Sequence, residues 1–210
     1  MKTLLHPTYF PSIAQYVIFA KSEHLVFEVE GNFQKQTYRN RTYIYGANGK
    51  LMFTVPVRHV KETKHQEYKE IKVANETPWQ RLHWRSLESA YRTSPYFEYY
   101  EDELRPLFEK RYDFLMDLNL DTIQLINECL QLEVETSKTT TYEPIITNTA
   151  IHDYRKLAIV KKEPDYGFET YTQVFDDKQG FLPNLSILDL LFNEGTNALT
   201  YLERQTISNS

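Results

Sequence analysis

Residues 3–29 read TLLHPTYFPSIAQYVIFAKSEHLVFEV, and this stretch decides the fold class. It opens with a short apolar run that ends at His6, which the following proline keeps out of helical backbone. Pro11 then opens a segment with apolar residues at helical spacing, and residues 24–29 form a second apolar run. Strand, loop, helix and strand in this order are the unit from which a parallel α/β sheet is built.

A hairpin and a helical middle follow this unit. Residues 43–45 and 51–57 are rich in β-formers and flank Asn48-Gly49, a pair typical of a tight hairpin turn. Further along, Thr77 is expected to cap a helix. Its apolar stripe has helical spacing and consists of Trp79, Leu82, His83, Ser86, Leu87, Ala90 and Tyr91. Another helix is predicted over residues 104–115, and a third behind an Asp121 cap.

The last third of the chain is predicted to return to the core. Residues 137–148 are polar and form the expected exposed loop or linker. Residues 171–175 resemble a strand, and residues 186–195 form a helix that Gly195 ends. Because this helix is apolar on nearly every side, we expect it to be buried. Its Asp189 then needs a partner, predicted to be Arg39 or Arg41. The fold class is therefore α/β, with a mixed α+β arrangement as the alternative, in one domain over residues 1–210.

Charge and composition exclude several classes of protein. With 24 Lys plus Arg against 29 Asp plus Glu, the net charge of −5 disfavours nucleic-acid binding. Cys129 is the only cysteine, which excludes an intramolecular disulfide and a thiolate metal cluster. No apolar run approaches the ~18 residues of a membrane span, and no signal-peptide core is recognisable. We expect a cytoplasmic protein with no membrane or nucleic-acid partner, while the oligomeric state stays open.

A polar cluster after the second predicted strand is the first candidate site. Gln34, Lys35, Arg39, Asn40 and Arg41 lie in the loop beyond this strand, where ligands usually bind in parallel sheets. The two guanidinium groups and the ammonium group could hold a phosphate or a carboxylate. The alternative is a solvated charged loop in which nearby glutamates balance the cations.

His6, at the end of the first predicted strand, is the candidate catalytic residue. Its charge changes near physiological pH, so it can act as a general acid or base or contact a phosphate. The alternative is a hydrogen-bonded structural histidine. His83, on an apolar helix stripe, is expected to be a core residue. Glu28 and Glu30 could bind Mg²⁺ beside phosphates, although two glutamates do not define a site, and no other metal ligands are predicted.

Four blocks of sequence resemble the WbqC-like protein family: His6–Pro11, 32–41, the hairpin with 54–57, and 181–195. The resemblance implies a cytoplasmic bacterial protein linked to surface-polysaccharide biosynthesis, and it supplies no catalytic residues. Together with the cations, it predicts a group transferase that binds a phosphorylated small molecule such as a nucleotide-sugar or its precursor. Whether the protein is an enzyme stays open. The alternative is a non-catalytic ligand-binding or interaction module with a contact surface at residues 96–100.

Overall fold

Four parallel strands form the main sheet in the order β5-β2-β1-β6, within a computed structural model that describes residues 1–58, 66–161 and 163–207. The strands are β1 Lys2–Leu5, β2 His24–Phe27, β5 Glu135–Lys138 and β6 Ile151–Asp153. Leu5 pairs with Phe27, and Phe27 pairs with Lys138, so these strands end level with one another. The strand β6 ends one residue earlier than these three strands, because its last residue, Asp153, pairs with Leu4. A parallel sheet covered by helices confirms the predicted α/β class.

The helix α1, Ile13–Ala20, connects β1 to β2 as predicted and is buried along almost its whole length. Its first N–H groups are satisfied by the far end of the chain. The N–H of Ile13 donates to the carbonyl oxygen of Leu185 at 3.0 Å, and that of Ala14 donates to Oδ1 of Asn184 at 2.7 Å. The amino end of α1 therefore depends on residues more than 160 positions downstream in the sequence.

The predicted hairpin is also confirmed. The strands β3, Arg41–Gly46, and β4, Gly49–Thr54, pair in antiparallel fashion around a tight turn. Gly49 has φ 101°, a conformation that favours glycine. The helix α2, Trp79–Tyr91, packs against β3 and buries most of its predicted stripe, but Leu82 is 53% exposed.

Two further helices complete the middle of the chain, α3 at Phe97–Glu109 and α4 at Leu115–Leu130. The predicted Asp121 cap is wrong, because Asp121 lies inside α4 and accepts hydrogen bonds from Lys110 and Tyr112. The remaining elements are η1 Tyr68–Glu70, η2 Arg155–Ala158, α5 Asp176–Gln179, α6 Ile187–Glu194, η3 Gly195–Asn197 and α7 Ala198–Arg204.

Two sequence predictions about extended or exposed segments are corrected by the structure. Residues 171–175 form no strand: Tyr171 and Gln173 both point at Asp189, and this alternating burial imitates a strand pattern. The run at residues 96–100 presents little aromatic surface, because Phe97 and Tyr100 are buried and Tyr99 is its only largely exposed aromatic residue. Residues 137–148 begin inside β5, and the rest of this segment has no helix or strand.

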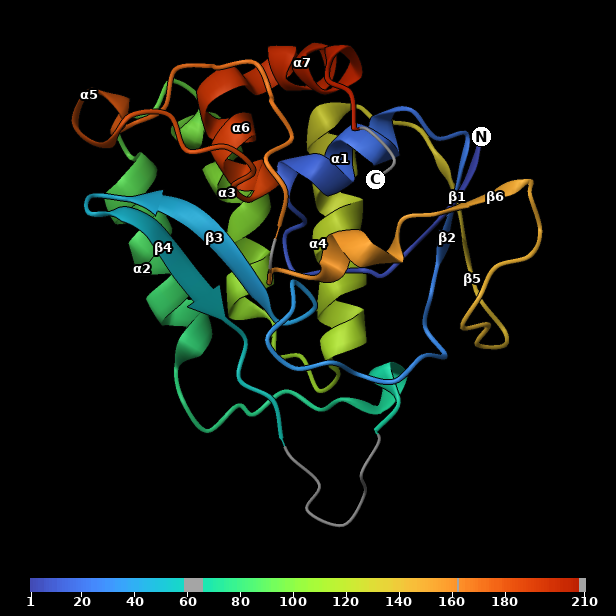
Figure 1. The fold of residues 1–210 in the computed structure, drawn as a ribbon. Helices are drawn as coiled ribbons and strands as arrows, with labels where there is room; N and C mark the ends of the chain where they lie inside the picture. The colour runs from blue at the N-terminus through green and yellow to red at the C-terminus, as the bar shows by residue number, and fades with distance from the viewer. Residues whose placement is uncertain (59–65, 162, 208–210) are drawn as a thin grey trace.

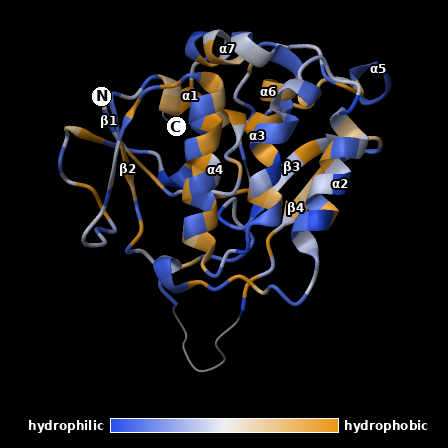
Figure 2. Ribbon diagram, turned by 180° about the vertical axis from the view of Figure 1, so that it is seen from behind, coloured by the Kyte–Doolittle hydropathy of each residue, from blue (hydrophilic) through white to orange (hydrophobic). Residues whose placement is uncertain are grey.

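The elements form layers around an aromatic-rich core. In Figure 1 the parallel sheet lies on the right and the hairpin on the left, with α3 and α4 between them. Figure 2, from behind, shows the same order reversed, with apolar and polar residues alternating along α4. Among the described helices, none combines the length and apolar character that crossing a bilayer requires.

Candidate functional site

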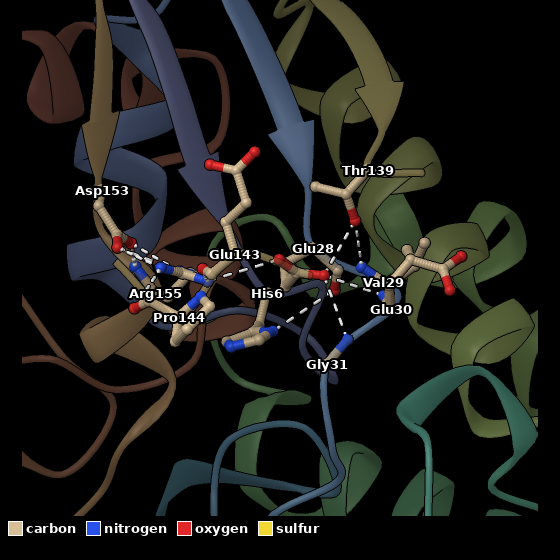
Figure 3. A network of polar contacts seen from close by, with 10 residues as sticks. All are labelled: His6, Glu28, Val29, Glu30, Gly31, Thr139, Glu143, Pro144, Asp153 and Arg155. Carbon is tan, nitrogen blue, oxygen red and sulfur yellow. Dashed lines mark hydrogen bonds and ion pairs between the residues drawn. The ribbon is translucent and has the colours of Figure 1, made fainter. Parts of the chain in front are cut away.

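The carboxyl ends of the parallel strands carry a connected polar network (Figure 3). Glu28, directly after β2, lies at its centre and is 1% exposed. Its Oε1 accepts hydrogen bonds from the N–H groups of Glu30 at 2.9 Å and Gly31 at 3.2 Å, and from the Thr139 hydroxyl at 2.9 Å. Its Oε2 lies 3.5 Å from Nη1 of Arg155. One carboxylate thus joins the segments that follow β2, β5 and β6.

Arg155, just after β6, connects the end of that strand to the segment between β5 and β6. Its Nε and Nη2 donate to the Asp153 carboxylate at 2.6 to 3.1 Å, and Nη1 donates to the carbonyl oxygen of Glu143 at 2.8 Å. Nη2 also donates to the carbonyl oxygen of Pro144 at 3.3 Å. With Glu28, these acceptors use all five N–H groups of a guanidinium. The bonds to Asp153 raise the pKa of Arg155, which has no donor left for a ligand.

His6, directly after β1, lies at the same edge of the sheet. Its Nδ1 is 3.4 Å from the backbone oxygen of Glu28, so a proton on Nδ1 can be donated to that oxygen. Figure 3 shows the other ring nitrogen pointing away from Glu28. Burial lowers the pKa of His6 well below its usual value, and the positive charges of Arg39 and Arg155 lower it further. The imidazole is therefore neutral at pH 7, with Nε2 available as an acceptor.

Arg39 is a buried cation with few partners. Its side chain is 4% exposed, Nη1 donates to the Thr37 hydroxyl at 3.3 Å, and Nε has no hydrogen-bond partner among the described residues. None of the described carboxylates lies within 4 Å of the guanidinium. Burial lowers the pKa of Arg39. Because a desolvated charge is unfavourable unless it is paired, Arg39 is a candidate for binding an anion.

Two buried side chains hold Arg39 in place. The ring of Tyr68 lies under the guanidinium, with its centroid 5.6 Å from Cζ. The Nδ2 of Asn119, on α4, donates to the backbone oxygen of Arg39 at 2.7 Å and to the Tyr68 hydroxyl at 2.5 Å. That hydroxyl in turn donates to the carbonyl oxygen of Pro7 at 2.6 Å. The cation is therefore fixed relative to the loop that follows β1.

A pocket of about 510 Å³ opens at these strand ends, lined among others by His6, Arg39, Tyr142, Asp153 and Lys156. The chain leaves β1 towards β2 on one side, whereas β6 lies on the other side of β1. Diverging loops at such a point form the usual ligand crevice of an open parallel sheet. A wider groove of about 1480 Å³ separates α4 from β2 and β5, but none of the predicted site residues lines it.

The pocket brings together some of the predicted site residues and leaves others outside. His6, Gln34 and Arg39 line it. Lys35 is exposed and lies outside the lining, as does Arg41, the first residue of β3. Of the three cations predicted to hold an anion together, Arg39 is thus the only one that lines the pocket.

Asn40 lies beside the pocket's lining, in the core. Its side chain is buried, and Nδ2 donates to the carbonyl oxygen of Val55 at 3.3 Å. The N–H of Val55 donates back to the backbone oxygen of Asn40 at 2.9 Å. These contacts attach the loop that carries Arg39 to the residue that follows β4.

Asp189 is buried as predicted, but its predicted arginine partner is wrong. Its carboxylate is 0% exposed and accepts hydrogen bonds from the hydroxyls of Tyr91 at 2.7 Å and Tyr171 at 2.5 Å, and from Nε2 of Gln173 at 2.8 Å. No guanidinium of the described residues lies within 4 Å of it. Neutral donors, one from α2 and two from the segment at residues 171–173, satisfy this carboxylate.

The glutamates considered for magnesium already have protein partners. The Glu28 carboxylate accepts the donors described above, and Glu30 pairs with Lys69 at 2.5 Å. Within the described residues, no group of three or more His, Cys, Asp or Glu side chains is placed to hold a metal ion.

Sequence reasoning missed the contribution of the β5 to β6 region. Asp153, Arg155 and Tyr142 come from a stretch predicted as a linker or left unassigned, because β5 and β6 are short and mostly polar. An alternating apolar pattern would have identified β5 and β6 as strands, but edge strands of this length do not need such a pattern.

Comparisons with known proteins agree with the resemblance read from the sequence. The chain is 27% identical to Uncharacterized protein Rv1507c of Mycobacterium tuberculosis, over 95% of this chain and 96% of that protein. No solved structure shows a significant match. A sequence model described as the WbqC-like protein family matches residues 6–164, which include every residue of the strand-end network and most of the pocket-forming chain. The chain therefore belongs to the WbqC-like protein family.

Proposed function

We propose that this protein is a group transferase that binds a phosphorylated small molecule in the pocket at the strand ends, with Arg39 holding the phosphate. The observation that carries the proposal is the burial of the Arg39 guanidinium without a carboxylate partner among the described residues. Arg155, which lies close by, has all its donors occupied, so Arg39 is the guanidinium with free capacity in this pocket. Charge-assisted, bidentate contacts make a guanidinium well suited to a phosphate.

His6 is placed to move a proton in this pocket. A hydroxyl or amine of the acceptor attacks the transferred group, and its proton passes to Nε2 of His6. The bond to the phosphorylated leaving group breaks, the electron pair leaves with the phosphate, and Arg39 stabilises the developing negative charge. Burial lowers the pKa of His6 and the charge of Arg39 lowers it further, so an anion bound to Arg39 would offset the second effect, raise that pKa and make the imidazole a better base.

Membership of the WbqC-like family supports an activated sugar or its precursor in bacterial surface-polysaccharide biosynthesis as the substrate. The location proposed for this activity is the cytoplasm, where activated sugars are made. Mg²⁺ would enter with the phosphates of such a ligand, since Mg²⁺ needs only one or two protein carboxylates.

Calorimetric titration with phosphorylated ligands tests the proposal. The ligands are sugar phosphates and nucleotide-sugars, each with and without Mg²⁺, and the variants are Arg39→Gln and Lys35→Ala. We expect Arg39→Gln to abolish binding and Lys35→Ala, outside the pocket lining, to keep it. The melting temperature of unliganded Arg39→Gln should not fall, because the substitution removes a buried unpaired charge. Binding that survives in Arg39→Gln, or a variant that merely unfolds, would contradict the proposal.

Turnover then separates the transferase from the alternative of a non-catalytic ligand-binding module. In the transferase, His6→Gln keeps ligand binding and loses group transfer. A protein that binds its ligand through Arg39 and transfers nothing to any acceptor would be the binding module.

A further inference from the structure

Tyr142 contributes an aromatic ring to the lining of the strand-end pocket. It lies in the segment between β5 and β6, lines the pocket together with Arg39, and is 48% exposed. A tyrosine that turns about half of its surface towards solvent loses the free energy of burying a large apolar ring. Such a ring beside an anion site is suited to contact with a ligand.

The backbone around Tyr142 is held rigidly by Arg155. The guanidinium lies over the tyrosine ring, with Cζ 5.6 Å from the ring centroid. Arg155 also donates to the carbonyl oxygens of the next two residues, Glu143 and Pro144. Because Arg155 is itself fixed by Asp153, the ring is positioned relative to β6 before any ligand binds.

Gly31 leaves just enough room for this ring. A Cβ atom at position 31 would lie 3.1 Å from two ring carbons of Tyr142, closer than ordinary van der Waals contact. The N–H of Gly31 is held by the Glu28 carboxylate, so the backbone at this position is fixed as well. The backbone at Gly31 therefore determines the position of the Tyr142 ring.

We propose that Tyr142 selects the ligand: the phosphate held by Arg39 is attached to a sugar or nucleoside ring, and that ring packs against the tyrosine. This inference rests on the proposed function, since it assumes the anion site at Arg39. The amide side chains of Asn32 and Gln34 line the same pocket and can bind hydroxyl groups of such a ring. An aromatic face with a few polar groups around it is the usual composition of a site for ring-bearing ligands.

Four ligands in calorimetric titration separate the ring from the phosphate. Glycerol 3-phosphate has a phosphate and no ring, glucose 1-phosphate adds a sugar ring, uridine monophosphate adds a nucleoside, and UDP-glucose carries both. We expect Tyr142→Ala to weaken the ring-bearing ligand about fivefold or more and to leave glycerol 3-phosphate unchanged, since stacking of a base on an aromatic residue is worth at least this factor. Tyr142→Phe should keep the wild-type affinity. The control is Tyr99→Ala, which removes an exposed tyrosine outside the pocket lining.

Gly31→Ala gives a second, independent perturbation, because it displaces the ring of Tyr142 without removing it. It should reproduce the ligand selectivity of Tyr142→Ala, with the melting temperature monitored as a check on folding. Whichever of glucose 1-phosphate and uridine monophosphate becomes weaker identifies the ring that contacts Tyr142.

Different outcomes overturn different claims. If all ligands bind through Arg39 and Tyr142→Ala weakens none of them, or weakens glycerol 3-phosphate equally, the ring inference is wrong and the phosphate site stands. If no phosphorylated ligand binds the wild-type protein, or binding survives in Arg39→Gln, the proposed function fails and the inference fails with it.

Discussion

The buried carboxylate of Asp189 allows a quantitative prediction about stability. Its three hydrogen-bond donors are Tyr91, Tyr171 and Gln173, and no water-exposed surface remains on the side chain. Asp189→Ala removes the acceptor and leaves the hydroxyl protons of Tyr91 and Tyr171 unpaired in the core, while Nε2 of Gln173 keeps its bonds to the carbonyl oxygen of Leu182 and to the Tyr171 hydroxyl. The matched control is Asp177→Ala, which removes an exposed aspartate in α5.

The size of the effect follows from the number of unpaired donors. Each buried donor without a partner costs about 1–3 kcal/mol, and part of the loss is offset because a desolvated negative charge disappears. For the two tyrosine hydroxyls we expect Asp189→Ala to lower the free energy of unfolding by about 2–4 kcal/mol. This is a large fraction of the roughly 5–15 kcal/mol by which domains are stable.

Asp189→Asn should cost less, about 1–2 kcal/mol. The amide oxygen can still accept from Tyr171 and Gln173, while the new NH₂ group faces the Tyr91 hydroxyl. That hydroxyl already accepts from the N–H of Tyr45 at 2.9 Å, so one hydroxyl proton loses its acceptor rather than two.

Urea unfolding at pH 7, followed by the fluorescence of the buried Trp79 and Trp84, measures these differences. The expected order of stability is wild type and Asp177→Ala together, then Asp189→Asn, then Asp189→Ala. A loss below about 1 kcal/mol in Asp189→Ala would refute the assignment of Asp189 as the acceptor that holds these three donors.

Other predictions concern pH and backbone conformation. Burial raises the pKa of Asp189, so the unfolded chain loses this proton at a lower pH than the folded protein does. The free energy of unfolding therefore falls as pH rises from about 4 through the raised pKa. The urea midpoints of Asp189→Asn should lack this part of the pH dependence. Burial lowers the pKa of His83 to about 4, so its contribution to stability is lost as pH falls from about 6.5 to 4, and His83→Gln should flatten the urea midpoint in that range. Gly195→Ala places a Cβ 2.6 Å from the Tyr96 ring at φ 53°, whereas Gly49→Ala adds only the strain of φ 101°; thermal melts should show the larger drop for Gly195→Ala, and an equal drop would mean that Tyr96 moves freely aside.

The sequence predicted the elements whose local patterns are strong. The proline at position 11, the helical spacing after it and the Asn48-Gly49 turn each specify a local conformation, so residues 3–29 and the hairpin were predicted correctly. The strands β5 and β6 were missed, because short edge strands with polar side chains have no period that distinguishes them from loops. Strand order depends on long-range pairing, which no local pattern contains.

The candidate site shows the same division. His6 directly follows β1 and Arg39 lies in the loop after β2, so the sequence alone placed both at the edge of the parallel sheet where loops gather. Arg155 and Tyr142 belong to a stretch more than 100 residues further along the sequence than β2, and they reach the pocket only because β6 pairs with β1. For Asp189 the sequence predicted burial, and burial requires donors without specifying which ones.

The hydrogen bonds from Leu185 and Asn184 to the start of α1 bear on how the protein forms during synthesis. The four strands of the parallel sheet and the pocket-lining residues all lie at or before residue 159 and are synthesised before residues 184 and 185, the acceptors for the amino end of the helix that joins β1 to β2. In the nascent chain, the first N–H groups of α1 therefore lack their acceptors until the last quarter of the chain emerges. Truncations or fusions near residue 185 should consequently damage a pocket that they never touch.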